Sequence, residues 1–136
     1  RYDLQLRFSD FDMMGHVNNA RFLTFIEDAR IDYLEQVLKQ PLTKPDYASV
    51  VAHLTIDYKA PVLPYDEACI YSRTEKTGGK SITLVSRVIR FPNGNTGEAM
   101  VAAECKSVLV TVEKATGRAI NHPQELADGI RAMENQ

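Results

Sequence analysis

The residue types best suited to chemistry gather in one short segment, residues 9–19. It holds two aspartates, Asp10 and Asp12, then a histidine, His16, and two asparagines, Asn18 and Asn19. A carboxylate can act as a nucleophile or a general base, and a histidine can carry a proton near neutral pH. The segment directly precedes a predicted helix, whose start offers unpaired N–H groups and a partial positive charge. Such a site can hold a carboxylate ionised or stabilise a developing oxyanion.

Two other interpretations of this segment compete with catalysis. Asp10-x-Asp12-x-x-Gly15 begins like a calcium-binding loop, but Met14 and Arg21 occupy loop positions five and twelve, where calcium needs oxygen ligands. We therefore expect no metal here. The second interpretation is a structural loop whose Asp and Asn side chains only cap the helix. The segment is longer than one helix cap requires. Its adjacent residues Met13 and Met14 are also apolar, which is unusual on a turn that should face water.

Hydrophobic periodicity predicts the elements that would position the segment. Alternation from Tyr2 to Phe8 predicts a strand before it, and i, i+3/i+4 spacing predicts one long helix from Asn18 to Lys39 after it. Short turns indicate that the last three of the remaining strands form an antiparallel meander, and Pro123 opens a short C-terminal helix. This order predicts an α+β fold, with the helix packed on a five-stranded antiparallel sheet. The four further strands are expected at residues 48–58, 67–75, 81–91 and 99–112.

Length, composition and charge exclude several classes of protein. The 136 residues, 44% hydrophobic and 25% charged, suit one globular domain over residues 1–136. A net charge of -2 supplies no field for holding nucleic acid or an anionic membrane. No apolar run approaches the roughly 20 residues of a membrane span. Cys69 and Cys105 form no CxxC pair, so we expect no zinc site and no disulfide framework, but buried free thiols in a reducing cytoplasm.

The segment and the predicted helix together contain a longer motif, Asp10-x-Asp12-x-x-Gly15-His16-Val17-Asn18-Asn19 followed by Glu27-x-x-Arg30. This motif resembles the 4-hydroxybenzoyl-CoA thioesterase-like group of hotdog-fold acyl-CoA thioesterases. Its Gly-His-Val-Asn-Asn part is also similar to a segment of acyl-acyl-carrier-protein thioesterases. The resemblance covers nearly the whole chain and implies a single hotdog domain with the long helix at its centre. It also implies a homodimer or homotetramer, because hotdog sites form between subunits, and no cofactor, because coenzyme A is part of the substrate.

The resemblance carries residue roles onto this chain. The family's catalytic aspartate falls on Asp12, and its oxyanion donor, a backbone N–H at the helix start, falls on Asn19. A thioester expels a thiolate whose conjugate acid has a pKa near ~8.5, so a carboxylate can suffice, either by attacking the carbonyl or by activating water. His16 is a supporting residue, as a proton carrier, a substrate contact or a loop brace. Gly15 and Asn18 are candidate substrate contacts, although Gly15 can serve through its backbone geometry and Asn18 as a cap.

A coenzyme A substrate would bring phosphates, and one basic cluster could meet them. Arg73, Lys76 and Lys80 surround Gly78-Gly79, and Ser81 follows directly. Lysine and the backbone N–H groups of a glycine turn can bind phosphate oxygens. The alternative is that these charges only solubilise a hairpin.

Three weaker signals lie elsewhere. Glu27 and Arg30, one helical turn apart, are expected to form a structural ion pair, with Glu27 as a reserve catalytic carboxylate. His53 and Asp57 share one face of a predicted strand, which suggests solvent or a subunit interface. His122 is expected at the surface.

The resulting prediction is an acyl-CoA thioesterase that releases a free acid and coenzyme A. Hydrolysis of acyl-acyl-carrier protein is one alternative, and a non-catalytic module that binds acyl groups or coenzyme A is another. The presence of Asp12 favours catalysis. The sequence does not indicate which acyl chain is preferred.

Overall fold

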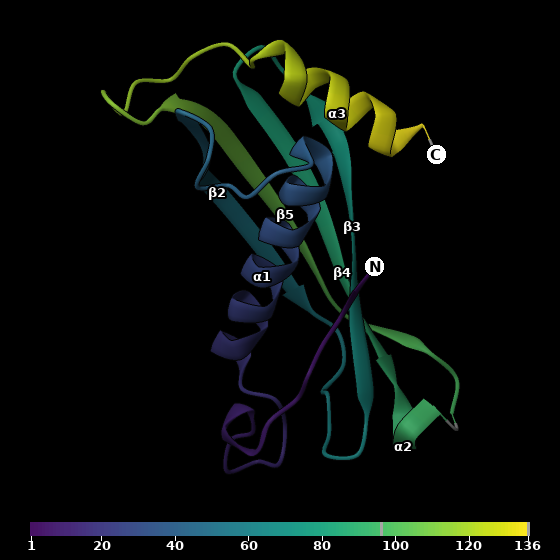
Figure 1. The fold of residues 1–136 in the computed structure, drawn as a ribbon. Coiled ribbons are helices and arrows are strands. Elements are labelled where there is room, and N and C mark those ends of the chain that lie inside the picture. Colours follow the sequence, from purple (N-terminus) through teal and green to yellow (C-terminus); the bar gives the residue numbers. More distant parts are fainter. Residues whose placement is uncertain (96, 136) are drawn as a thin grey trace. The chain divides into compact units, whose positions relative to one another are not determined.

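The structure is a computed structural model that describes residues 1–95 and 97–135. Its elements confirm the predicted α+β class, and the long helix and the four later strands lie close to the predicted ranges. No helix in the described part of the chain has the length and apolar character needed to cross a membrane. In chain order the elements are β1 (Tyr2–Asp3), the 3-10 turn η1 (Phe8–Asp10), α1 (Asn19–Leu38), β2 (Tyr47–Tyr58), β3 (Glu67–Thr77), β4 (Ser81–Phe91), the single-turn α2 (Pro92–Asn95), β5 (Met100–Glu113) and α3 (Gln124–Glu134) (Figure 1).

The strands form one five-stranded antiparallel sheet in the order β1-β3-β4-β5-β2. The adjacent β3, β4 and β5 confirm the predicted meander. The β3–β4 turn is closed by a hydrogen bond from the Gly78 N–H to the Ser81 carbonyl oxygen at 2.8 Å. At one edge, β1 pairs antiparallel with β3, and Tyr2 lies opposite Ile70. At the other edge, β2 lies beside β5, so two strands distant in sequence become neighbours.

The first strand is much shorter than the alternation of apolar residues predicts. The predicted strand to Phe8 is wrong, because β1 ends at Asp3 and Phe8 begins η1 with its side chain 96% exposed. The Asp10 carboxylate accepts a hydrogen bond from the Arg7 N–H at 2.8 Å. This local bond from a side chain to the backbone favours a turn over continued strand pairing.

Contacts within the chain divide it into two compact units. The first unit contains the polar segment and the beginning of α1. The second contains the end of α1 and all of α3. The units comprise, respectively, Arg1–Arg30, Ile56–Ser72 and Ser86–Cys105, and Ile31–Thr55, Arg73–Val85 and Lys106–Gln136.

Helix α1 has 20 residues and buries one stripe of its surface. The five residues of this stripe are each at most 6% exposed. Spacing of three and four residues places them on one helical face. The first unit also buries Val62, and the free thiols of Cys69 and Cys105 are buried as predicted. The buried stripe consists of Phe22, Ile26, Ala29, Tyr33 and Val37.

In the second unit, α3 packs close to the end of α1. Leu126 and Ile130 of α3 belong to the same buried apolar cluster as Val37. A Cβ atom on Gly129 would overlap the backbone of Val37, so glycine permits this approach. The Tyr33 hydroxyl donates a hydrogen bond to the α3 residue Glu134 at 2.5 Å, which anchors the end of that helix.

Candidate active site

The polar segment folds into a tight hairpin that leads into α1. Phe11 and Val17 form an isolated antiparallel bridge. Inside it, the Asp12 N–H donates to the His16 carbonyl oxygen at 2.8 Å, and the Gly15 N–H donates to the Asp12 carbonyl oxygen at 3.0 Å. Gly15 has φ +78, a left-handed conformation that glycine adopts without strain. The predicted special backbone geometry at Gly15 is confirmed.

The carboxylate of Asp12 lies exposed on this hairpin. Its Oδ1 atom accepts the Met14 N–H at 2.9 Å, and the His16 N–H lies at a longer 3.4 Å. These bonds make an Asx turn, so the structural interpretation of the aspartate is partly correct. They also hold the carboxylate in one orientation while it remains accessible to solvent. Met13 and Met14 are 103% and 77% exposed on the same turn.

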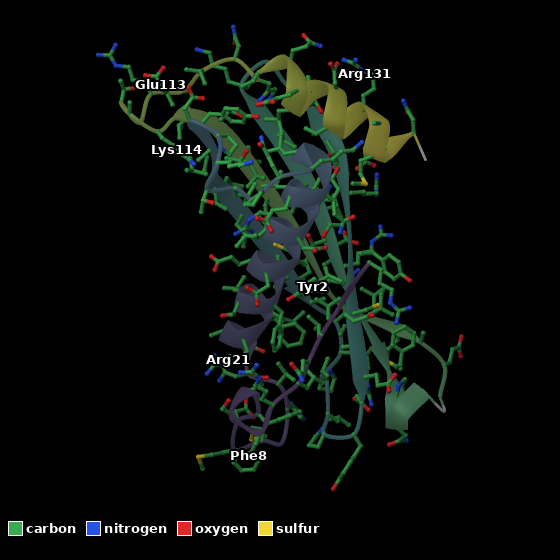
Figure 2. All side chains as sticks on the ribbon, in the orientation of Figure 1. Tyr2, Phe8, Arg21, Glu113, Lys114 and Arg131 are labelled. Carbon is green, nitrogen blue, oxygen red and sulfur yellow. The ribbon has the colours of Figure 1, made fainter. Side chains whose placement is uncertain are left out.

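Asp10 has a different environment from Asp12, although it is only two positions earlier. It is 5% exposed, and its Oδ2 atom accepts the Arg7 N–H at 2.8 Å. Its Oδ1 atom lies 3.7 Å from the Nε atom of Arg21, which Figure 2 labels at the first turn of α1. Its carbonyl oxygen accepts the Asn18 N–H at 2.8 Å. Asp10 therefore braces the segment that presents Asp12.

The beginning of α1 has the capped geometry that the sequence predicts. The Asn18 side-chain oxygen accepts the Ala20 N–H at 2.9 Å, which confirms Asn18 as a cap. Asn19 is the first helical residue, and N–H groups in a first turn have no partner within the helix. Its carbonyl oxygen accepts a hydrogen bond from the Tyr58 hydroxyl at 2.9 Å.

An open cleft of about 270 Å³ adjoins this helix start. It brings together two predicted residues, His16 and Asn19, while Asp12 lies on the adjoining hairpin outside the lining. The rest of the lining includes a segment after β2 that the sequence reasoning did not select. Pro61, which cannot donate to a neighbouring strand, is the one signal in the sequence for this segment. The full lining is His16, Val17, Asn19, Phe22, Tyr58, Lys59, Ala60 and Pro61.

The predicted phosphate-binding cluster lies in the second unit. Arg73 and Lys76 are exposed on β3, Lys80 is exposed in the following turn, and Ser81 is partly buried at the start of β4. The turn is ordered by backbone hydrogen bonds, including one from the Thr111 N–H to the Lys80 carbonyl oxygen at 3.0 Å. The three cations therefore stand on one β-hairpin.

The three weaker candidates have separate outcomes. Glu27 and Arg30 form the predicted ion pair, with oxygen and nitrogen 4.0 Å apart. His53 and Asp57 are exposed on β2, as predicted. The surface position predicted for His122 is wrong, because the ring is partly buried in the second unit.

Both ring nitrogens of His122 have partners. Nδ1 lies 2.8 Å from the hydroxyl of the buried Thr111, and Nε2 lies 3.0 Å from the Ser81 carbonyl oxygen. A carbonyl can only accept, so Nε2 carries a proton in this contact. These partners are distant in sequence, which explains why no local pattern predicted them.

Within residues 1–95 and 97–135, no group of three or more His, Cys, Asp and Glu side chains could hold a metal ion.

The chain belongs to the Thioesterase-like superfamily, whose family model matches residues 6–130, and this membership supports a hotdog-fold thioesterase. The predicted family is therefore confirmed, and the chain is a thioester hydrolase. It is 31% identical over 131 residues to the long-chain acyl-CoA thioesterase FadM of Escherichia coli strain K12, with 96% of each chain covered. It is 27% identical to the acyl-CoA thioester hydrolase YbgC of Escherichia coli O157:H7, covering 88% of this chain and 91% of that protein.

One solved structure is similar to this chain in both fold and sequence. A thioesterase of Thermus thermophilus, complexed with coenzyme A and Zn, superposes with a TM-score of 0.82 and 34% identity. The match covers 98% of this chain and 92% of that protein.

Proposed function

We propose that this chain hydrolyses an acyl-CoA to a free acid and coenzyme A, with Asp12 as nucleophile or general base and the Asn19 N–H as oxyanion donor. The observation that carries the proposal is the junction of hairpin and helix. An exposed, oriented carboxylate lies on the hairpin, and Asn19, the first residue of α1, lines a cleft of about 270 Å³. The named relatives FadM and YbgC act on acyl-CoA thioesters, which supports this substrate class.

Two routes are chemically balanced with these groups. In the first, an Asp12 oxygen attacks the thioester carbon and coenzyme A leaves as a thiolate, forming an acyl anhydride that water then cleaves. In the second, Asp12 takes a proton from a water molecule that attacks the carbon directly, and the C–S bond then breaks to release the acid and the coenzyme A thiolate, which takes up the proton. Both routes place negative charge on the former carbonyl oxygen, where the Asn19 N–H and the helix terminus stabilise it. His16, in the cleft lining, supports either route.

The substrate contacts form the next part of the proposal. Gly15 and Asn18 shape the entrance through the backbone of the hairpin and the helix cap. The phosphates of coenzyme A bind the hairpin cluster, where the cations are exposed. Coenzyme A enters as part of the substrate, so no cofactor is required. The cluster consists of Arg73, Lys76, Lys80 and Ser81.

A second copy of the chain completes the proposed enzyme. β2 is an edge strand, and its Val50 and Val51 are 44% and 42% exposed. An apolar edge strand favours pairing with another chain. We therefore infer a homodimer or homotetramer of hotdog domains spanning residues 1–136, each with α1 at its centre, in a cytoplasm that keeps Cys69 and Cys105 reduced. Sedimentation velocity on the purified protein should show at least a dimer, and a monomer at all concentrations would contradict this.

The experiment that tests the proposed chemistry is Asp12→Asn. Because the side chain is exposed, the variant should fold, while kcat for thiol release from acyl-CoA should fall at least ~10²-fold, since an amide is neither a comparable nucleophile nor a base. The matched control is Asp46→Asn, an exposed aspartate in the second unit, which should keep the kcat of the wild type. A large loss of kcat in Glu27→Gln, together with an unchanged kcat in Asp12→Asn, would instead assign the catalytic carboxylate to Glu27 on α1.

The same assay distinguishes the acyl donor. Acyl-CoA and acyl-acyl-carrier protein with the same acyl chain are compared at one salt concentration. A higher kcat/KM for acyl-CoA is expected. A clearly higher kcat/KM for acyl-acyl-carrier protein would identify that thioester as the substrate instead.

A further inference from the structure

Tyr58, the last residue of β2, contacts the first turn of α1 in two ways. Its hydroxyl donates a hydrogen bond to the Asn19 carbonyl oxygen at 2.9 Å. Its ring meets the ring of Phe22 edge to face, with centroids 5.5 Å apart and planes at 81°. Phe22 is only 3% exposed, so this contact is continuous with the core of the first unit. All three residues line the cleft.

The backbone that carries Tyr58 is itself held in place. The N–H groups of Lys59 and Ala60 both donate to the Ala102 carbonyl oxygen of β5, at 2.8 and 3.1 Å. Slightly further along, the Val62 carbonyl oxygen accepts the Val17 N–H at 2.9 Å. The segment 58–62 is therefore fixed to the sheet and contacts the helix start on both sides of residue 18.

One peptide unit makes a hydrogen bond at each end. The peptide between Asn19 and Ala20 presents its N–H to the Asn18 side chain and its carbonyl oxygen to the Tyr58 hydroxyl. A planar peptide bound at both ends has little freedom to rotate. The Asn19 N–H belongs to the preceding peptide, which is joined to this one at the Asn19 Cα atom. Its direction therefore depends on how firmly the peptide between Asn19 and Ala20 is held.

We propose that Tyr58 is a positioning residue for thioester hydrolysis, which holds the first peptide of α1 so that the Asn19 N–H stays directed at the developing oxyanion. The inference rests on the proposed function and adds a residue to it. Oxyanion donors act through preorganisation, so a loosened donor stabilises the transition state less while substrate binding is largely retained. Partial burial raises the pKa of the Tyr58 hydroxyl, which favours its protonated, hydrogen-bond-donating form.

The test is Tyr58→Phe, which keeps the ring against Phe22 and removes only the donated hydrogen bond. Thiol release from acyl-CoA should show kcat lowered about 3- to 10-fold, the range expected for one neutral hydrogen bond, with KM within about 2-fold of the wild type. The Kd of a non-hydrolysable thioether analogue of acyl-CoA should be unchanged. The control is Tyr65→Phe, in the same unit, whose side chain is 89% exposed and which should keep the kcat of the wild type.

A second variant keeps the inference testable if Tyr58→Phe folds poorly. Asn18→Ala releases the other end of the same peptide and should give the same pattern, with kcat lowered and KM retained. A residue that only stabilised the fold would lower the thermal midpoint but leave kcat per folded molecule unchanged well below that midpoint.

The outcomes separate the two proposals. An active wild type, an inactive Asp12→Asn and an unchanged kcat in Tyr58→Phe would overturn the role of Tyr58 alone. A raised KM with unchanged kcat would also overturn it, since that pattern indicates lost ground-state binding. A wild type that releases no thiol from any acyl-CoA would overturn the proposed function, and the positioning role with it.

Discussion

Replacing Asp10 by asparagine should destabilise the protein, whereas the same replacement at Asp12 should mainly abolish activity. Asp10 is 5% exposed and its carboxylate accepts the Arg7 N–H at 2.8 Å. A hydrogen bond to a charged acceptor contributes about 1.5 to 3 kcal/mol. The Arg21 contact at 3.7 Å, from a side chain that is 46% exposed, adds at most about 1 kcal/mol. Because asparagine retains an oxygen acceptor but no charge, Asp10→Asn should cost about 1 to 3 kcal/mol of unfolding free energy.

The measurement is urea denaturation monitored by far-UV circular dichroism, with the unfolding free energy extrapolated to water. Asp12→Asn should change this free energy by no more than about 0.5 kcal/mol, because its side chain is exposed. At temperatures where both variants are folded, kcat should be lower in Asp12→Asn than in Asp10→Asn. Arg21→Met separates the two contributions and should cost no more than about 1 kcal/mol.

Two results would refute this reasoning. An Asp10→Asn variant as stable as the wild type would mean that the buried carboxylate does not brace the hairpin. If Arg21→Met lost as much unfolding free energy as Asp10→Asn, the ion pair, and not the hydrogen bond from the Arg7 N–H, would be the stabilising contact.

Two further predictions concern alkaline stability and coenzyme A. Burial, with the hydrogen bond to Glu134, raises the pKa of Tyr33 above its unfolded value of about 10, so the native state keeps the proton longer and unfolding free energy should decline as pH rises beyond about 10. Urea titrations from pH 9 to 11 should show a smaller decline in Tyr33→Phe, and equal slopes would contradict this. Replacing Arg73, Lys76 and Lys80 by alanine should raise KM for acyl-CoA but not for a pantetheine thioester without the nucleotide phosphates. The difference should shrink with salt, since exposed charges are screened over about 8 to 10 Å; equal KM values for acyl-CoA would leave these cations as solubilising residues.

Local patterns were sufficient to predict most of the elements. The helix predicted from Asn18 to Lys39 is Asn19–Leu38, and the strand predicted at 81–91 is Ser81–Phe91. Both segments are long and strongly periodic, so many apolar residues fit the same helical or strand period. The predicted strand ending at Phe8 was wrong, since β1 ends at Asp3 and, near the predicted end, the Arg7 N–H donates to the Asp10 side chain in a local turn.

The sequence by itself also determined the class of protein. The motif from Asp10 to Asn19 is contiguous, and its glycine and its cap act within a few residues of one another. A contiguous motif can be recognised without knowing the fold, so the thioesterase family and the candidate residues Asp12 and Asn19 followed directly from it. Their catalytic roles stay predictions until Asp12→Asn is assayed.

Only the tertiary structure distinguished the two aspartates and found the contacts made across the chain. Asp10 and Asp12 are the same residue type two positions apart, and their difference in burial arises from Arg21 and the hairpin around them. Tyr58 meets Asn19 across 39 positions, and His122 meets Ser81 across 41. Contacts at such separations leave no periodic trace in the sequence, because they arise only when packed strands and helices bring distant backbones within hydrogen-bonding distance.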